Sequence, residues 1–499
     1  MPAGLPDSLT QKNRRPPLDA YDVAIHLEVE GVTDQVARNV HGYGGTLAMA
    51  DAHFVKRLSV RPAAVKASAG HSLVQYFRGV AFALPVLISA VVMIVFSISL
   101  WGGSIPIEDA AAVAIGTLSS FLVTGGIVQV MAWRVLFFLT TADPATAKET
   151  CWLWQRRGVL SVFGFGIVGW LMNGFFGWLP DPLARLALGF HVALGLLWLA
   201  SGALYALEGI LWIGLATALG LAAAGITHLL GATLYASQFC GLAVAVGVSQ
   251  GAAYRLFAKK TRRTDGKAEK MPIARLAHTA APYFLYGSLY YCFLFADRWI
   301  AWTGRTASET LPIFFRGDYE AGLDIALIAF VFGAGWVHAS THAFFGAVQR
   351  ALSSFKPTEA GLFNESIQTF YRNRILLFLP CAVAVGILVY MGGVGFGVLN
   401  TFVMRKVSAV ALVGFLFLVI GLWNASLFFA FSLPFHTLRS MGLGLVADLI
   451  VSYFASRMGH YSDAVYGFAA GALFFALWST WLCKKEFSKA DHLQFAASV

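Results

Sequence analysis

The sequence is poor in charged residues and has no cysteine arrangement that would build a disulfide framework. Only 12% of its 499 residues are charged, whereas 58% are hydrophobic. Soluble globular chains carry roughly 25% charged residues, and such a domain could not bury this much apolar surface. The five cysteines are scattered, mostly in apolar runs, without a CxxC pair, so we expect them to act as small hydrophobic side chains.

Catalytic signatures are also missing. The chain has no Walker P-loop, GxSxG elbow or HExxH motif, and its predicted outer loops are too short to hold a catalytic domain. We therefore expect no enzymatic activity and no cofactor. His338 and His342 are four residues apart and would share one helical face, but a metal site would need a third ligand. A polar stripe on the helix is the favoured interpretation, and no metal site is predicted.

Long apolar runs dominate the rest of the chain. Repeated runs of about 18 residues or more predict an all-α, polytopic membrane protein with about twelve transmembrane helices. The predicted spans lie near residues 79–101, 110–138, 158–179, 184–205, 208–230, 232–256, 278–303, 321–345, 375–398, 408–432, 440–457 and 463–483.

The positive charges predict topology and domain division. Most Lys and Arg residues fall in segments that an inside N-terminus would place in the cytoplasm, so both termini are predicted to be cytoplasmic. This placement accounts for the net charge of +10 without a nucleic-acid partner. A dense basic segment separates the spans into two six-helix bundles. The predicted divisions are a cytoplasmic extension (1–75), a first bundle (76–257), a basic linker (258–276), a second bundle (277–485) and a cytoplasmic tail (486–499).

Two segments outside the predicted spans carry weaker signals. Residues 51–66 have a charge pattern that fits either a basic amphipathic helix at the membrane surface or a plain linker. The loop 349–374 predicts a cytoplasmic amphipathic helix that lies against the bundle.

An acid and a base stand side by side in the seventh predicted span, where intramembrane charge is costly and indicates function or specific pairing. Neighbouring helical residues point about 100° apart, so Asp297 and Arg298 cannot satisfy each other. Asp324, near the outer start of the next span, is the predicted partner of Arg298. The alternative for Arg298 is snorkelling to the outer headgroups beside Trp299 and Trp302.

Other polar residues lie at depth. Asp448 is near mid-bilayer, which favours a solvated or coupling role over a structural hydrogen bond. Gly125 and Gly126 precede Gln129 and predict either close helix packing or a local break that lines a cavity. Arg134 is near the inner end of its span, where snorkelling is the default. The candidate transport-pathway or gate residues are therefore Asp297, Arg298, Asp324, Asp448, Gln129 and Arg134.

Two segments resemble a known family. Residues Leu118 to Arg134, with Thr-Gly-Gly, an apolar pair and Gln129 at the centre, resemble the second span of the Pel-type exopolysaccharide inner-membrane transporter. The run from Asp297 to Trp302 is similar to that family's Asp-Lys-(aromatic)-Ile-(aromatic)-Trp, with Arg298 in place of Lys, and Asp324 fits the acid that opens the next span. The resemblance covers residues 75–485 and leaves the first 70 without a counterpart.

The resemblance implies the fold of the multidrug, oligosaccharidyl-lipid and polysaccharide (MOP) flippase superfamily. It implies a bacterial inner-membrane transporter that moves an exopolysaccharide or lipid-linked glycan outward, with Asp297, Arg298 and Asp324 at a gate or coupling-ion site. Its partners would be membrane lipids, a cytoplasmic glycosyltransferase and other secretion-complex subunits. The alternatives are a cation-coupled drug or metabolite antiporter of the same superfamily, and a membrane-embedded polysaccharide synthase or scaffold subunit.

Overall fold

The computed structural model describes residues 20–29, 32–59, 69–81, 106–140, 143–261, 273–304, 313–355 and 359–491, and every regular element within these ranges is a helix. The elements are α1 (Ala20–Val29), α2 (Asp34–Asn39), α3 (Thr46–Ser59), α4 (Ala69–Ala81), α6 (Ile107–Thr140), α7 (Pro144–Phe176), α8 (Asp181–Ala206), α9 (Ile210–Leu229), α10 (Leu234–Thr261), α11 (Ile273–Trp302), α12 (Gly317–Ser354), α13 (Ala360–Gly395), α14 (Phe402–Ala430), α15 (Pro434–Met458), the 3-10 turn η3 (Tyr461–Ala464) and α16 (Val465–Phe487). The predicted all-α class is confirmed.

The helices from α6 to α16 coincide with the second to twelfth predicted spans, and most of the first, 79–101, falls outside the described residues. Nine of the described helices are long and apolar enough to cross a membrane, α10 and α11 being the less apolar exceptions. Only 11% of the apolar window of α7 and 6% of that of α13 are buried by the protein. Helices that expose so much apolar surface need lipid around them, so the chain is a multi-pass membrane protein.

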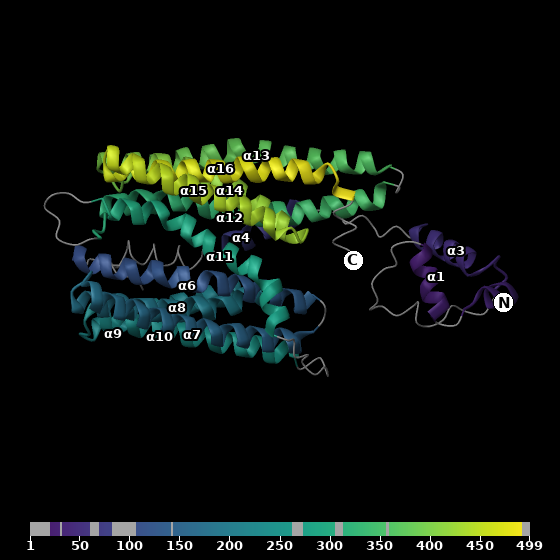
Figure 1. Ribbon diagram of the computed structural model, residues 1–499, viewed down its shortest axis with the longest axis horizontal. Coiled ribbons are helices and arrows are strands. Elements are labelled where there is room, and N and C mark those ends of the chain that lie inside the picture. Colours follow the sequence, from purple (N-terminus) through teal and green to yellow (C-terminus); the bar gives the residue numbers. More distant parts are fainter. Residues whose placement is uncertain are drawn as a thin grey trace. The chain divides into compact units, whose positions relative to one another are not determined.

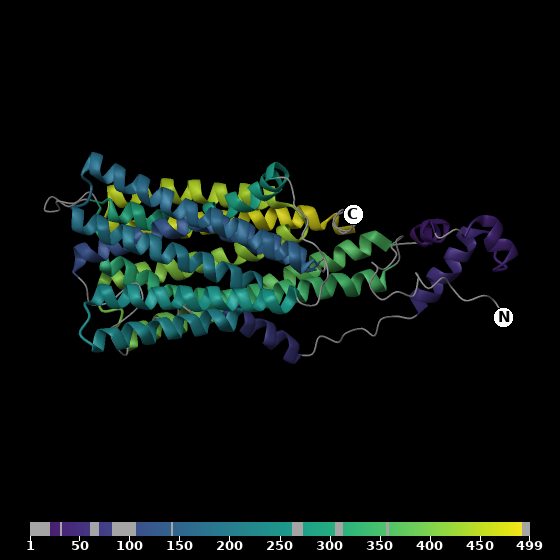
Figure 2. The same cartoon turned by 90° about the horizontal axis from the view of Figure 1, so that it is seen from below.

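The chain divides into two compact units, 1–68 with 352–354, and 69–351 with 355–499. In the second unit, α6 to α10 pack on one another, α13 to α16 do the same, and α11 packs against α6 and α15. Its long helices run alongside one another (Figure 2), and Figure 1 shows α11 between α6 and the helices α12, α14, α15 and α16. α11 therefore joins the two groups, and we call its contact with α6 the seam.

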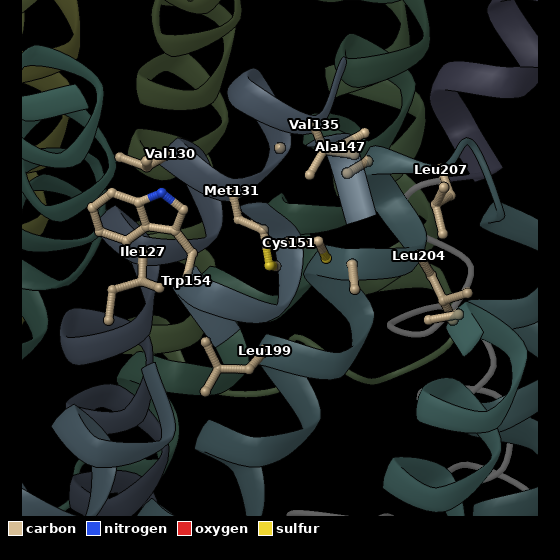
Figure 3. Close-up of a cluster of buried hydrophobic side chains, with 14 of the residues drawn as sticks. Ile127, Val130, Met131, Val135, Ala147, Cys151, Trp154, Leu199, Leu204 and Leu207 are labelled. Carbon is tan, nitrogen blue, oxygen red and sulfur yellow. The ribbon is translucent and has the colours of Figure 1, made fainter. Parts of the chain in front are cut away.

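The first group of helices is held by an apolar core. Ile127, Val130 and Met131 of α6 meet Trp154 of α7 and Leu199 of α8 (Figure 3). Local signals place these helices: Asp143 caps α7 by accepting a hydrogen bond from the backbone N–H of Thr146 at 3.0 Å. The helix ends at Gly177, whose φ of 62° favours glycine.

Glycines let α6 and α11 approach closely at the seam. A Cβ on Gly287 would lie 2.5 Å from the carbonyl oxygen of Gly125, and one on Gly126 would lie 2.6 Å from that of Phe284. α6 is continuous through this point, so close packing, and not a helix break, is what these glycines provide.

The predicted amphipathic helix in 349–374 is wrong as a separate element. α12 continues to Ser354 and α13 begins at Ala360, so the segment forms the ends of two long helices. At about 1.5 Å per residue, 38 and 36 residues exceed a bilayer core of about 30 Å. The extensions are stable because Val348, Phe363 and Phe487 pack together in one apolar cluster.

The N-terminal unit has a small core of its own. Leu27, Ala37 and Met49, from α1, α2 and α3, are buried together. The Asp34 carboxylate accepts a hydrogen bond from the backbone N–H of Thr46 at 2.7 Å, which fixes the loop before α3. In the segment 51–66, for which the sequence fits either a helix or a linker, residues 51–59 are helical, and 60–66 lie outside the described residues.

Candidate functional site

Asp297 is held inside the protein by a tyrosine from the next helix. Its side chain is 1% exposed, and Oδ2 accepts a hydrogen bond from the Tyr319 hydroxyl of α12 at 2.5 Å. The other oxygen, Oδ1, has no hydrogen-bond partner among the described residues. The expectation that Asp297 needs a partner on another helix is met for only one of its two carboxylate oxygens.

Arg298 faces a different neighbour, as the helical angle requires. Its guanidinium forms an ion pair with Glu320, whose second oxygen accepts a hydrogen bond from the Trp302 indole at 3.0 Å. The ion-paired side chains of Arg298 and Glu320 are only 14% and 10% exposed. The snorkelling alternative for Arg298 is therefore wrong.

The predicted partner of Arg298, Asp324, is one helical turn away from the actual one. Asp324 is an exposed residue of α12 that contributes to the electrostatic field at Arg298 without bonding to it. The sequence prediction failed because it began the span at residue 321, whereas α12 begins at Gly317. Glu320 therefore lies in the first turn, where the helix dipole favours acids.

Asp448 of α15 is a second buried acid, with 0% exposure. Its Oδ1 accepts a hydrogen bond from the Ser452 hydroxyl at 2.7 Å, and its Oδ2 has no partner among the described residues. α15 packs against α11, the helix that carries Asp297. The structure thus brings together two acids that the sequence placed in different spans.

Ser452 stands between Asp448 and the turn that leads to α16. Its hydroxyl oxygen is also 2.8 Å from the carbonyl oxygen of Ala464. A hydroxyl has one hydrogen, so Ser452 cannot form a full hydrogen bond to both acceptors at once. Asp448 and the Ala464 carbonyl are therefore alternative acceptors for the Ser452 hydroxyl.

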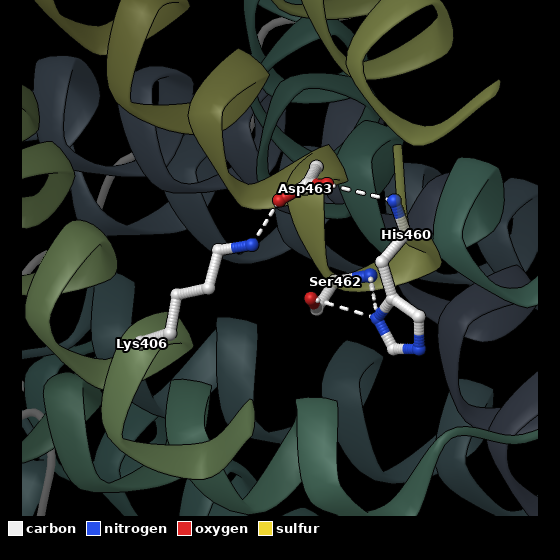
Figure 4. Close-up of polar contacts among 4 residues, drawn as sticks. All are labelled: Lys406, His460, Ser462 and Asp463. Carbon is white, nitrogen blue, oxygen red and sulfur yellow. Dashed lines mark hydrogen bonds and ion pairs between the residues drawn. The ribbon is translucent and has the colours of Figure 1, made fainter. Parts of the chain in front are cut away.

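The turn η3, which carries Ala464, is itself fixed by charge. The Asp463 carboxylate pairs with the Lys406 ammonium of α14 and accepts a hydrogen bond from the backbone N–H of His460 at 2.7 Å (Figure 4). The imidazole Nδ1 of His460 lies 2.9 Å from the Ser462 hydroxyl. The turn that carries the Ala464 carbonyl is thus tied to α14 by an ion pair.

Gln129 and Arg134 lie elsewhere, on the seam. Gln129 packs beside Gly287, and Arg134, 7% exposed, donates a hydrogen bond to the Thr279 hydroxyl of α11. Thr279 is 18 residues from Asp297, about 27 Å along the helix. The six predicted residues therefore form two sites, and the burial of Arg134 contradicts snorkelling.

Sequence reasoning missed Tyr319, Glu320 and Ser452. Glu320 was detectable as an acid one turn before Asp324, and Ser452 as a hydroxyl at the i+4 position from Asp448. No sequence pattern indicates that Tyr319 bonds to Asp297. No group of three or more His, Cys, Asp and Glu side chains with metal-binding placement occurs in the described residues.

No protein-family model and no curated protein matches the sequence of this chain. Its structure is similar to the Vibrio cholerae MATE transporter VcmN in the bent form, with 14% identity, a TM-score of 0.58, and coverage of 86% of this chain and 99% of VcmN. A MOP superfamily transporter from Pyrococcus furiosus gives 15% identity, a TM-score of 0.60 and coverage of 83% and 95%.

A third similar structure is the outward-facing conformation of a multidrug resistance MATE family transporter of the MOP superfamily. It gives 15% identity, a TM-score of 0.54, and coverage of 85% of this chain and 96% of that one. The likeness extends over nearly the whole of each of these proteins. The chain therefore has the fold of MOP superfamily transporters.

Proposed function

We propose that this protein is a membrane transporter in which cation binding at Asp297 and Asp448 is coupled to movement of its two helix groups. One observation carries the proposal: two buried carboxylates lie on helices that pack together, α11 and α15, and each has an oxygen without a hydrogen-bond donor among the described residues. Buried carboxylates in this condition are unfavourable unless a cation binds between them or one is protonated. The MOP-transporter fold supports a transport role for such a site.

A proton is the cation that the hydrogen bonds accommodate best. When Asp448 is ionised, Ser452 donates to it; when Asp448 is protonated, it can donate to Ser452, and Ser452 can donate to the Ala464 carbonyl. Protonation thereby reverses the hydrogen bond within α15 and exchanges the acceptor of the Ser452 hydroxyl from Asp448 to the Ala464 carbonyl, which adds a bond between α15 and the turn before α16. This exchange provides a path from proton binding to helix packing.

The ion pair of Arg298 and Glu320 has a different part in the proposal. It ties the end of α11 to the first turn of α12, beside Asp297 and Tyr319. Because α11 also forms the seam with α6, movement of α11 at the acidic site would be transmitted to the other helix group. Asp324, exposed next to this pair, would contact solvent or substrate.

The proposed cargo is an exopolysaccharide or lipid-linked glycan, moved outward across a bacterial inner membrane with both termini in the cytoplasm. The support is the resemblance of segments 118–134 and 297–302 to the Pel-type transporter. Stacked aromatic rings along the seam, such as Trp133 with Tyr283 and Phe121 with Tyr291, give it surfaces of the kind that sugars contact. The proposed partners remain a cytoplasmic glycosyltransferase and secretion-complex subunits.

A cation-coupled drug or metabolite antiporter is the second candidate. The acidic site favours coupling whatever the cargo is, and one similar structure is named as a multidrug resistance transporter. Polymer secretion and drug sensitivity, measured in the same strains, separate the candidates.

The experiment compares cells that express the wild type, Asp297→Asn, Asp448→Asn and a control, Asp181→Asn, which changes an exposed acid at the start of α8. We expect polymer secretion to fall at least about tenfold for the two buried-site variants, with normal protein levels, and to be unchanged for the control. Loss of drug resistance with normal secretion would favour the antiporter. Unchanged secretion and drug resistance in both variants would refute a coupling role.

A further inference from the structure

Arg134 is a buried cation whose hydrogen-bonding capacity is only partly used. Its side chain is 7% exposed, and one guanidinium nitrogen, Nη2, donates to the Thr279 hydroxyl across the seam. Its Nε–H has no partner among the described residues. A guanidinium has five N–H donors, so Arg134 retains capacity for a further acceptor.

No described carboxylate forms an ion pair with Arg134. Arg298 of α11 is also mostly buried, but its guanidinium is paired with the Glu320 carboxylate. The fold thus supplies a counter-charge to Arg298, in contrast to Arg134. A buried charge without a counter-charge is strongly unfavourable. The buried guanidinium of Arg134 therefore has no neutralising anion among the described residues.

Aromatic rings hold the guanidinium in place. It lies 4.4 Å from the centroid of the Trp133 ring, and Trp133 stacks on Tyr283 of α11 at 3.8 Å with an angle of 16°. Such a stacked, planar fork is well suited to bind two oxygens of one phosphate. The site thus combines a fixed orientation, free donors and uncompensated positive charge.

The surroundings of Arg134 indicate where the anion would come from. Leu136 and Phe137, in the next turn of α6, are large apolar side chains with 47% and 44% exposure. In a membrane protein such residues border lipid. An anion reaching this end of the seam would therefore be carried on a lipid.

We propose that Arg134, Trp133 and Tyr283 form a binding site for the phosphate group of a lipid-borne ligand at the seam between α6 and α11. In the structure the Thr279 hydroxyl occupies one donor of Arg134, and the phosphate would replace it and also accept from Nε–H. The inference rests on the proposed transport cycle, because the seam must open to admit the ligand. A membrane phospholipid and a lipid-linked glycan carrier share this phosphate chemistry.

The test measures lipid binding directly and needs no transport assay, so that its failure is distinct from failure of the proposed function. The full-length protein in neutral detergent is titrated with dioleoylphosphatidylglycerol, and bound lipid is resolved by native mass spectrometry. Arg134→Gln is expected to weaken the tightest binding about tenfold, as loss of a charge-assisted phosphate contact would. The matched control is Arg157→Gln, another arginine placed over a tryptophan ring (Trp154, 5.2 Å), which should change affinity less than twofold.

Thr279→Val keeps the test decisive if Arg134→Gln does not fold. This variant frees Nη2 without removing the charge, so the affinity for phosphatidylglycerol should rise. Unchanged or weaker binding by Thr279→Val would show that Arg134 only fastens the helices and would overturn the proposal, as would equal binding by Arg134→Gln and Arg157→Gln.

Two further ligands define the chemistry. Inorganic phosphate that displaces the lipid in an Arg134-dependent way would support a phosphate site that also accepts soluble anions, whereas no displacement would support recognition of the lipid-borne group. Oleate, an anionic lipid without phosphate, should bind independently of Arg134. Arg134-dependent binding of oleate as tight as that of phosphatidylglycerol would contradict the phosphate assignment.

Discussion

Asp297 of α11 and Asp448 of α15 are buried acids on two helices that pack against each other, and each leaves one carboxylate oxygen without a described hydrogen-bond donor. Each also has a single hydroxyl partner, Tyr319 for Asp297 and Ser452 for Asp448. The two acids form a site that a proton or another cation would complete. This relationship underlies the first prediction.

Asp448→Asn should leave the protein at least as stable as the wild type. The substitution removes a buried charge, and a neutral amide costs less to bury than a carboxylate with an unpaired oxygen. The melting temperature of the purified protein in detergent tests this. Ser452→Ala is the comparison: it removes the only described donor to Asp448 and should cost about 1–3 kcal/mol. A melting temperature for Asp448→Asn clearly below that of the wild type would contradict the role given to the charge.

The ion pair of Arg298 with Glu320 should be worth far more than the neighbouring Asp324. Glu320→Gln leaves Arg298 mostly buried without its counter-charge and should destabilise the protein by about 3–5 kcal/mol. Asp324→Asn, at an exposed position one turn away, should change stability by less than about 0.5 kcal/mol. Unfolding by denaturant in mixed micelles measures both. Equal losses would contradict the assignment of Glu320 as the main counter-charge of Arg298.

The glycines of the seam should tolerate no side chain. Gly287→Ala would place a methyl group 2.5 Å from the Gly125 carbonyl oxygen and should cost about 1–3 kcal/mol through overpacking. Gly225→Ala in α9 is the matched control, because nothing lies within 4 Å of its new Cβ, and it should be neutral or slightly stabilising. The melting temperatures of the two variants test this prediction. An unchanged melting temperature for Gly287→Ala would mean that α6 and α11 do not pack as closely as the structure shows.

The N-terminal unit should lose stability in acid through Asp34. The Thr46 backbone N–H, then the Thr46 side chain, stabilise the Asp34 carboxylate and hold its pKa below the usual value. A carboxylate with a lowered pKa in the folded state contributes stability above its unfolded pKa of about 3.9, and that contribution is lost as the pH falls through the folded pKa. Hydrogen exchange of a peptide covering α3, corrected for intrinsic rates, should therefore show less protection at acid pH in the wild type. Asp34→Asn should show no such change, and an equal change in both would rule out Asp34 as the cause.

Hydropathy and charge placement predicted most of the fold. Eleven of the predicted spans correspond to α6 through α16. A long apolar run in lipid must satisfy its own backbone hydrogen bonds, and an α-helix does so within one segment. Helix ends were harder to predict: α12 and α13 extend beyond the bilayer thickness, since side chains such as Phe363 and Phe487 find tertiary partners there. A hydropathy profile does not describe the tertiary contacts that stabilise these helix ends.

The candidate site was predicted only in part for the same reason. Charge at membrane depth identified Asp297, Arg298 and Asp448, because any such group must be accommodated specifically. Which group meets which depends on how α11, α12 and α15 pack, and a shift of one turn in α12 exchanged Asp324 for Glu320 as the partner of Arg298. The pairing of Asp297 with Tyr319 has no sequence signature.

Proton coupling of the two helix groups is tested most directly by the distance between them as a function of pH. Spin labels at Leu211 of α9 and Leu388 of α13, which are 78% and 70% exposed, report that distance by double electron–electron resonance in a variant without native cysteines. In the wild type we predict two distance populations whose ratio changes with pH, and in Asp297→Asn/Asp448→Asn a ratio that does not. A single population at every pH, or a pH response that persists in the double variant, would contradict coupling through these two acids.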